Sequence, residues 1–384
     1  MHLNPAAKSR APLLTKALEQ GRLALTPISP TVAFTSINWK YLPKALVLAE
    51  SLKRFNPDWE FHVLLNDYLP DDTSFEHVDV IAPINHIGIQ NFDSWCFSHE
   101  VVELCTASKS FYFRYLLDAG YQNVFYFDPD MEVFNSLNYL LEELSRADTL
   151  LTPHADTDAL RESEILYTEM SVLAHGVFNL GFLGTRNSPN GRQVIDFWCR
   201  RMERYCHDDH ARGLFTDQKW FNLVPVYFDG VKVLKHKGCN VASWNVAHRA
   251  ITRSNNTFRA GPDELLFFHF SGYDASVPRR MFEIFGAYNE SIGALIESYD
   301  GKVAHQDATH PEARLPWVYA NFENGQTISR GTRRFYRSHL EYRASYPHPY
   351  FDHAEDSFYR LVQKHGEEAL DRQFDPPGFL RKYF

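Results

Sequence analysis

Two carboxylates and an imidazole stand at the ends of two apolar stretches of the sequence. Asp128 and Asp130 follow Val124–Phe127, whose unbroken apolar and aromatic character predicts a strand covered on both faces. The Asp-Pro-Asp order ends this strand, because proline has no N–H group for the ladder. His269 stands near the end of a later strand predicted over Leu265–Phe270. Ligands of open α/β sheets bind outside the carboxyl ends of the strands, and two carboxylates with one imidazole suit Mn²⁺ or Mg²⁺.

Each of these signals is weak when it is taken alone. On the order of one chance Asp-x-Asp match is expected in a chain of this length. A histidine that precedes Ser-Gly is more often a packed or hydrogen-bonded residue than a metal ligand. The hypothesis of a metal site at Asp128, Asp130 and His269 therefore depends on what the rest of the chain offers around it.

Polar side chains at two earlier strand ends could bind the base and ribose of a nucleotide. Thr35, Ser36 and Asn38 lie at the end of the first predicted strand, and Asp67 follows the second. For any single one of them, ordinary turn and capping chemistry is the stronger explanation. Together they predict the nucleotide end of a binding cleft.

Two cations precede the Asp-Pro-Asp strand on a predicted helix. Lys109 and Arg114 could meet the phosphates of a ligand, although Arg114 could instead pair with Asp118, four residues further on. We take both as candidate donor-binding residues, with the ion pair as the open alternative for Arg114.

Short polar side chains beside aromatic residues form a candidate sugar pocket. Asn179 lies in the segment Phe-Asn-Leu-Gly-Phe, and Asp217 with Gln218 follows Phe215. Sugar sites combine polar groups for hydroxyls with rings for the apolar faces of the sugar. Asn245 closes an Asn- and Trp-rich loop that we expect to line the same pocket. Helix capping at 217–218 and turn formation at 238–245 remain the alternatives.

The segments between these motifs alternate between strand and helix, which predicts an α/β fold with parallel strands and crossover helices. Strands are expected at Thr31–Ile37, Glu60–Asn66, His77–Ala82, Thr149–Pro153, Gly176–Gly184 and Val231–Leu234. Helices are expected at Tyr41–Phe55, Ser98–Ala119 with a break near Thr106–Ser110, Leu137–Ala147, Gly191–His207 and Phe215–Leu223 with Thr216 as N-cap. We divide the chain into an N-terminal extension (1–30), a catalytic domain (31–275) and a mostly helical C-terminal extension (276–384).

Composition excludes several classes of protein. The chain of 384 residues carries a net charge of −9, which disfavours a nucleic-acid polymer as partner. Its five cysteines are scattered, without a disulfide framework, and indicate a reducing cytoplasm. No apolar run approaches the roughly 20 residues that a transmembrane helix needs.

Five arginines between 330 and 343 interleave with aromatic residues, so the C-terminal extension could contact the inner face of a membrane. A helical cap with solvated charges is the more ordinary interpretation of this segment.

The order of these motifs resembles a GT-A glycosyltransferase and is similar to glycosyltransferase family 8 and related bacterial sugar transferases. The resemblance covers about two thirds of the chain, from Val32 to Asp274. It rests on Ala-Phe-Thr-Ser at 33–36, Phe-Arg at 113–114, Asp-Pro-Asp at 128–130, Phe-Asn-Leu-Gly-Phe at 178–182, Thr-Asp-Gln at 216–218 and His-x-x-Gly at 269–272. It implies the GT-A fold, with a mixed, mostly parallel central sheet flanked by helices.

The resemblance also implies roles for single residues. Asp128, Asp130 and His269 would hold Mn²⁺ (or Mg²⁺) on the donor diphosphate, and Arg114 would bind the donor. Asn179, Asp217 and Gln218 would contact the donor sugar, the last two as catalytic residues. The family carries a lysine soon after the glycine of its late motif, whereas here Gly272 is followed by Tyr-Asp; Arg279 or Arg280 could substitute.

The function so implied is transfer of a hexose from a UDP- or GDP-sugar to a hydroxyl of a glycan or glycolipid, with retention of configuration, in bacterial surface polysaccharide or glycoconjugate synthesis. Two alternatives remain open. A sugar nucleotidyltransferase would usually show an early glycine-rich loop, but no glycine follows the first strand until Gly88. An inactive nucleotide- or carbohydrate-binding protein on the same fold would not need the Asp-Pro-Asp motif and His269.

Overall fold

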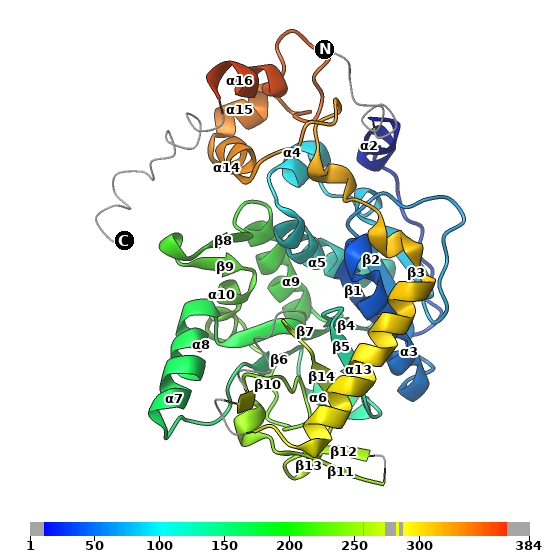
Figure 1. Cartoon of the computed structure of the whole chain (residues 1–384), viewed down its shortest axis with the longest axis vertical. Helices are drawn as coiled ribbons and strands as arrows, with labels where there is room; N and C mark the ends of the chain where they lie inside the picture. The colour runs from blue at the N-terminus through cyan, green and yellow to red at the C-terminus, as the bar shows by residue number, and fades with distance from the viewer. Residues whose placement is uncertain (1–10, 256, 273–281, 284–286, 367–384) are drawn as a thin grey trace.

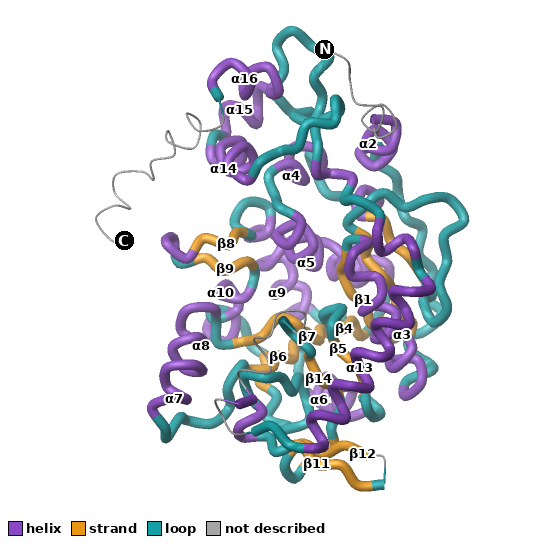
Figure 2. Tube along the Cα trace, viewed as in Figure 1, coloured by secondary structure: helices purple, strands orange, loops and turns teal. Residues whose placement is uncertain are grey.

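A mixed seven-stranded sheet forms the centre of the molecule, flanked by helices (Figures 1 and 2). The computed structural model describes residues 11–255, 257–272, 282–283 and 287–366. Six strands run in one direction, and only β7 is antiparallel to both of its neighbours. The mostly parallel α/β sheet predicted from the alternating pattern is confirmed. In spatial order the strands are β10 (Val231–Val233), β6 (Thr149–Pro153), β7 (Phe178–Arg186), β4 (Asn123–Phe127), β1 (Thr31–Ile37), β2 (Glu60–Leu65) and β3 (Val80–Pro83).

Helices cover both faces of this sheet and divide the core into two main apolar clusters. On one face Phe34 packs edge-on against Tyr112 and Phe113 of α5. On the other face Phe125 stacks on Trp59, among residues of α3 and α6. Strands with apolar residues on both faces need such two-sided cover, because an exposed face would lose roughly 25 cal/mol for each Å² of apolar surface left in water. The main covering helices are α3 (Leu42–Phe55), α5 (Val101–Ala119), α6 (Asn138–Arg146) and α9 (Pro189–Met202).

Local signals set the ends of the helix that carries Lys109. Glu100 and Glu103 form a reciprocal capping box at the start of α5. Gly120, with φ of 107°, ends the helix in the left-handed conformation that glycine adopts readily. The helix runs unbroken between these caps, so the expected break near Thr106–Ser110 is wrong. Serine hydroxyls at 108 and 110 bond to carbonyls one turn earlier and do not interrupt it.

A separate two-stranded sheet places the late histidine beside the two aspartates. Strand β5 (Met131–Val133) begins directly after Asp130 and pairs antiparallel with β14 (Phe267–His269). In this register His269 lies opposite Met131. The final apolar strand expected at Leu265–Phe270 is therefore present in shortened form, but it lies outside the central sheet.

The expectation for Thr216 is corrected by the structure. Thr216 ends β9 (Leu214–Thr216), which pairs with β8 (His207–Asp209), and its φ is 43°. The following helix, α10 (Gln218–Phe221), begins after Asp217, and no side chain caps it. A residue in the left-handed region cannot serve as the extended N-cap that a hydroxyl cap requires. The turn instead directs Asp217 and Gln218 inward.

The terminal segments pack on the sheet domain. Arg333 is 2% exposed and donates to the carbonyls of Phe97, His99 and Tyr319. Arg337 pairs with Glu103 at 2.8 Å. These two arginines are structural, so the basic aromatic surface expected here is smaller than the sequence suggested. The segments contain α2 (Ala11–Leu18), α13 (Glu290–Thr309), α14 (Arg330–Ser338), α15 (Leu340–Ser345) and α16 (Phe358–His365).

The remaining elements are short and lie around the sheet. Among the described residues, no helix has the length and apolar character needed to cross a bilayer. These elements are α4 (Phe92–Phe97), α7 (Glu162–Glu164), a π-helical turn (Ile165–Glu169), α8 (Met170–His175), α11 (Val224–Tyr227), β11 (Ile251–Ser254), β12 (Thr257–Ala260) and β13 (Asp263–Glu264).

Candidate active site

The structure brings the two aspartates and the histidine of the proposed metal site together. Nε2 of His269 lies 3.1 Å from Oδ1 of Asp130 and 3.7 Å from Oδ2 of Asp128. One potential ligand atom from each residue lies within 4.8 Å of those of the other two. This donor set of two carboxylates and one imidazole is the type that Mn²⁺ and Mg²⁺ accept.

Close approach of strand β7 makes room for this cluster. A Cβ atom on Gly181 would lie 2.7 Å from Cε1 of His269 and 2.8 Å from Oδ2 of Asp128. Only glycine lets the strand pass so near these two side chains. The backbone N–H of Asp128 also donates to the carbonyl of Gly181, which fixes the turn that carries the aspartate.

Electrostatics of the cluster favour a bound cation. Burial alone would raise the pKa of Asp130, but the adjacent His269 outweighs burial and holds this pKa below its usual value. Burial acts to lower the pKa of His269, and Asp130 with Asp128 raises it overall. The carboxylates of Asp128 and Asp130 therefore face the imidazole of His269 in a largely buried site. The residues present fit a divalent cation, which would supply the missing positive charge.

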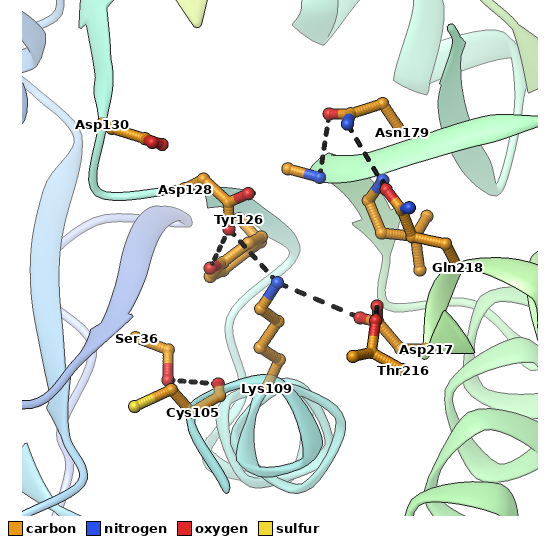
Figure 3. Close-up of polar contacts among 12 residues, drawn as sticks. Ser36, Cys105, Lys109, Tyr126, Asp128, Asp130, Asn179, Thr216, Asp217 and Gln218 are labelled. Atoms are coloured by element: carbon orange, nitrogen blue, oxygen red, sulfur yellow. Dashed lines mark hydrogen bonds and ion pairs between the residues drawn. The ribbon is translucent and has the colours of Figure 1, made fainter. Parts of the chain in front are cut away.

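Lys109 connects the metal cluster with Asp217 (Figure 3). Its Nζ lies 3.2 Å from Oδ1 of Asp128 and 3.9 Å from Oδ2 of Asp217, and 4.3 Å from the ring centre of Tyr126. Burial acts to lower the pKa of Lys109, but the two carboxylates raise it overall, so the ammonium stays charged. The hydroxyl of Tyr126 donates to Oδ1 of Asp128 at 2.5 Å. A buried positive charge thus stands beside the proposed phosphate position.

Asp217 is a buried carboxylate with an unused oxygen. It is 2% exposed, and its Oδ2 accepts no hydrogen bond within the described structure. Burial raises the pKa of Asp217 to about 6. The nearby Lys109 acts to lower this pKa, and the nearby Asp128 acts to raise it. A group of this kind can hold or accept a proton near neutral pH.

A chain of buried amides fixes the position of Gln218. Nδ2 of Asn179 donates to Oε1 of Gln218 at 3.3 Å, and Oδ1 of Asn179 accepts from the N–H of Gly181. Nδ2 of Asn240 donates to Oδ1 of Asn179 at 3.0 Å, and Nδ2 of Asn245 donates to the carbonyl of Asn240 at 3.0 Å. Asn245 therefore supports the pocket from behind.

These groups line one cavity of about 820 Å³ at the edge of the sheet where the parallel strands end. The antiparallel strand β7 starts at this same edge, because Phe178 pairs with Pro153 at the end of β6. Ligand sites at this edge are typical of open α/β sheets. The predicted residues that line the cavity are Ser36, Asn38, Lys109, Asp128, Asp130, Asn179, Asp217, Gln218 and His269.

Four predicted site residues do not line this cavity. Side chains alternate between the two faces of β1, so Thr35 points away from the cavity that Ser36 faces, and Thr35 is fully buried. Arg114 is five residues from Lys109, about 140° further around α5, and its guanidinium lies near the ring of Phe111. Asp67 lines a second cavity, and Asn245 acts through Asn240. The alternative pairing of Arg114 with Asp118 is not seen either, since Asp118 pairs with Arg192.

Two further cavity residues escaped the sequence analysis, and a third, Trp244, belongs to the loop that was expected to line the pocket but was not singled out. Tyr126 lies two residues before Asp128, and the period of a strand could have placed it on the same face. His154 follows β6 at the same sheet edge and bonds Asn179 at 3.1 Å; burial lowers its pKa to about 4, so the ring is neutral. Trp244 lies in the Asn- and Trp-rich loop, and its ring meets His269 edge-on at 5.2 Å. Strand ends and loop composition were thus usable signals for all three.

Helix α13 packs against β5, which follows Asp130, and against the residue after His269, which leads to a testable prediction. Lys302 forms an ion pair with the buried carboxylate of Glu132 on β5, and Tyr299 stacks at 3.7 Å on Phe270, next to His269. We expect Lys302→Met to leave the Glu132 charge unpaired and to weaken Mn²⁺ binding by up to about tenfold, as loss of supporting contacts often does. Calorimetric titration with Mn²⁺ measures the affinity. Lys302→Arg is the control, because it keeps the positive charge beside Glu132. Equal Mn²⁺ affinity in Lys302→Met would remove α13 from this supporting role.

Asp67 predicts a pH dependence of stability. Burial raises its pKa from 3.8 to about 7, although backbone amides of Val318 and Tyr68 oppose this. The folded state binds this proton more tightly than the unfolded state does. The resulting contribution of Asp67 to the free energy of unfolding is therefore full below about pH 4 and is lost as pH rises toward 7. Asp67→Asn should therefore raise the melting temperature more at pH 8 than at pH 5. Glu323→Gln, which removes a less buried charge nearby, is the control, and an equal shift at both pH values would contradict the prediction.

No protein-family model matches the chain. The protein YfnD of Bacillus subtilis (strain 168), described as uncharacterised, is 26% identical over 148 residues; these cover 38% of this chain and 45% of YfnD, less than half of the relative's length.

Solved structures similar to this chain include three glycosyltransferases. The galactosyltransferase LgtC, solved with donor and acceptor sugar analogues, is 18% identical over 71% of this chain and 99% of its own, with a TM-score of 0.40. The bifunctional glycosyltransferase WbbM is 14% identical over 73% and 53%, with a TM-score of 0.42. Glycosyltransferase GlyE of Streptococcus pneumoniae TIGR4 is 15% identical over 76% and 64%, with a TM-score of 0.40. These three similar structures are glycosyltransferases, and the comparison does not single out family 8.

Proposed function

We propose that this chain is a metal-dependent glycosyltransferase that moves a hexose from a UDP- or GDP-sugar to a hydroxyl of a glycan or glycolipid. One observation carries the proposal. The cluster of Asp128, Asp130 and His269 shares a single cavity with Lys109 and with the Asp217–Gln218 pair. A phosphate-binding end and a sugar-binding end in one cavity fit a nucleotide diphosphate sugar.

The order of residues along the cavity supports this orientation of the donor. Ser36 and Asn38, at the end of β1, with Val101 and Cys105, at the start of α5, give a mixed polar and apolar wall suited to a base and ribose. The metal cluster and Lys109 come next, where the diphosphate would lie. A divalent cation bound there would neutralise charge that develops on the leaving diphosphate.

The sugar end offers polar atoms that form no hydrogen bond within the described residues. Oδ2 of Asp217, Nε1 of Trp244 and Nδ1 of His154 are all buried without a hydrogen-bond partner among the described residues. Each of them belongs to a residue that lines the cavity. Buried polar atoms without partners are rare and costly, so sugar hydroxyls are natural partners for them.

Asp217 and Gln218 are the proposed catalytic residues. The carboxylate of Asp217, mostly ionised above its pKa of about 6, would stabilise positive charge on the sugar during transfer. We propose retention, in which the leaving phosphate takes the proton of the acceptor hydroxyl. In an inverting reaction Asp217 would instead be the base that takes this proton. Bacterial surface polysaccharide or glycoconjugate synthesis is the setting that we propose.

A screen of UDP- and GDP-hexoses with Mn²⁺, using the full chain, tests the proposal. We expect release of the nucleoside diphosphate from one donor and a glycoside with the donor's anomeric configuration, identified by NMR. Formation of UTP or GTP and a hexose 1-phosphate, when pyrophosphate is added to the donor, would instead indicate a nucleotidyltransferase. A β-linkage made from an α-linked donor would contradict retention while leaving glycosyl transfer intact.

A further inference from the structure

A second cavity, of about 210 Å³, lies between helix α2, the end of β2 and the segment 315–323. It shares no lining residue with the main cavity. Leu13 and Leu315 line it and are 41% and 42% exposed, so it communicates with solvent. Nothing in the proposed glycosyl transfer uses this cavity.

The walls of this cavity combine aromatic rings with acids. Trp39, Tyr68, Trp317 and Phe322 provide the rings. The ionisable side chains with a negative charge are Asp67 and Glu323, and no Lys, Arg or His among the described residues lines the cavity. Glu323 pairs with His353 at 3.3 Å, outside the cavity wall, whereas Asp67 has no basic side chain opposite it in the described lining.

Asp67 is the central polar group of this wall. It is 2% exposed, and its Oδ1 accepts from the N–H groups of Tyr68 and Val318, each at 3.0 Å. Its Oδ2 is buried and accepts no hydrogen bond from any described residue. The guanidinium of Arg333 lies 5.1 Å from the Trp317 ring, but it is committed to three backbone carbonyls and does not line the cavity. A buried carboxylate without a counterion is costly unless something else neutralises it.

We propose that this cavity binds a small organic cation, with a primary or quaternary ammonium group held between the Asp67 carboxylate and the rings of Trp39 and Trp317. Ammonium groups are attracted both to carboxylates and to the faces of aromatic rings, and tryptophan is the best of these. The indole N–H of Trp317 donates to the carbonyl of Asn66, which fixes this ring at the cavity wall. The proposal is independent of glycosyl transfer.

The occupant of this site would lie against the wall of the main cavity. Trp39 begins the 3₁₀ turn Trp39–Tyr41 and lines the second cavity. Asn38, Lys40 and Tyr41, which flank or belong to the same turn, line the main cavity. One short turn therefore separates the two sites.

Calorimetric titration of the full chain with methylammonium and tetramethylammonium chloride tests the proposal, with tert-butanol as the uncharged match for the latter. We expect saturable binding of at least one cation and no comparable binding of tert-butanol. Asp67→Asn, which keeps the size of the side chain, should lower the affinity for the cation by about tenfold or more. Trp317→Leu, which leaves the carboxylate in place, should also weaken binding and serves if Asp67→Asn fails to fold.

Three results would overturn the proposal. These are the absence of saturable binding by either cation, binding of tert-butanol as tight as that of tetramethylammonium, and unchanged cation affinity in the folded Asp67→Asn or Trp317→Leu variant. Circular dichroism of each variant shows whether it is folded. Sodium chloride at equal ionic strength controls for screening.

Discussion

Replacement of Asp130 by alanine is expected to reduce glycosyl transfer by on the order of a thousandfold, because the diphosphate loses the cation that neutralises its charge. Asp130 is the nearer carboxylate to His269, at 3.1 Å, so its loss leaves the imidazole and Asp128 as an incomplete pair. The fold should survive, since the turn around 128–130 is held by backbone bonds to Gly181 and Phe270. Initial rates with Mn²⁺ and calorimetric Mn²⁺ titration measure the effect.

Asp196→Ala is the matched control for this change. It also removes one acid, but from the exposed face of α9, and should leave both the rate and the Mn²⁺ affinity unchanged. Substantial Mn²⁺-dependent turnover in Asp130→Ala would show that the metal is held elsewhere.

Addition of a single methyl group at Gly181 is expected to have an effect nearly as large. The new Cβ would lie 2.7 Å from Cε1 of His269 and from Oδ1 of Asn179, and 2.8 Å from Oδ2 of Asp128. It would push apart the metal cluster and the amide chain that fixes Gln218. We expect Gly181→Ala to lose Mn²⁺ binding and transfer together, with a cost in stability of about 1–3 kcal/mol for overpacking. Calorimetry, turnover rates and thermal unfolding give the three readouts.

Gly184→Ala separates crowding of the metal cluster from general overpacking of β7. Its Cβ would meet the ring of Phe125 at 2.8 Å, so it strains the same strand without touching a metal ligand. We expect a similar loss of stability but retained Mn²⁺ binding. Equal Mn²⁺ affinity in Gly181→Ala and the wild type would mean that the cluster does not hold the metal in this geometry.

Strand ends were predictable from the sequence because an apolar run that stops at polar residues marks both the strand and its carboxyl edge. Asp128 and Ser36 were placed correctly at one edge for this reason, whereas Asn179 lies at the same edge because the antiparallel strand β7 starts there. Pairing between strands distant in sequence was not predictable. His269 reaches the aspartates through the register of β14 with β5, outside the central sheet.

Side-chain direction on helices and strands accounts for the residues that fell outside the cavity. Lys109 and Arg114 are both plausible phosphate ligands by sequence, and only the rotation of α5 brings Lys109 beside Asp128. Asp67 follows β2 as a ribose-binding acid would, but the C-terminal segment covers it through Val318. No local pattern in a single sequence indicates a contact between positions 67 and 318. The cover over Asp67 therefore could not be predicted without the structure.

The central claim is that the cluster of Asp128, Asp130 and His269 holds a cation that binds a nucleotide diphosphate in the main cavity. Calorimetric titration of the full chain with UDP and with GDP, in Mn²⁺ and in a chelator, tests it most directly. We predict saturable binding of at least one nucleotide that requires Mn²⁺ and that Asp130→Ala abolishes. Nucleotide binding of equal affinity in the chelator, or no binding of either nucleotide in Mn²⁺, would contradict the claim.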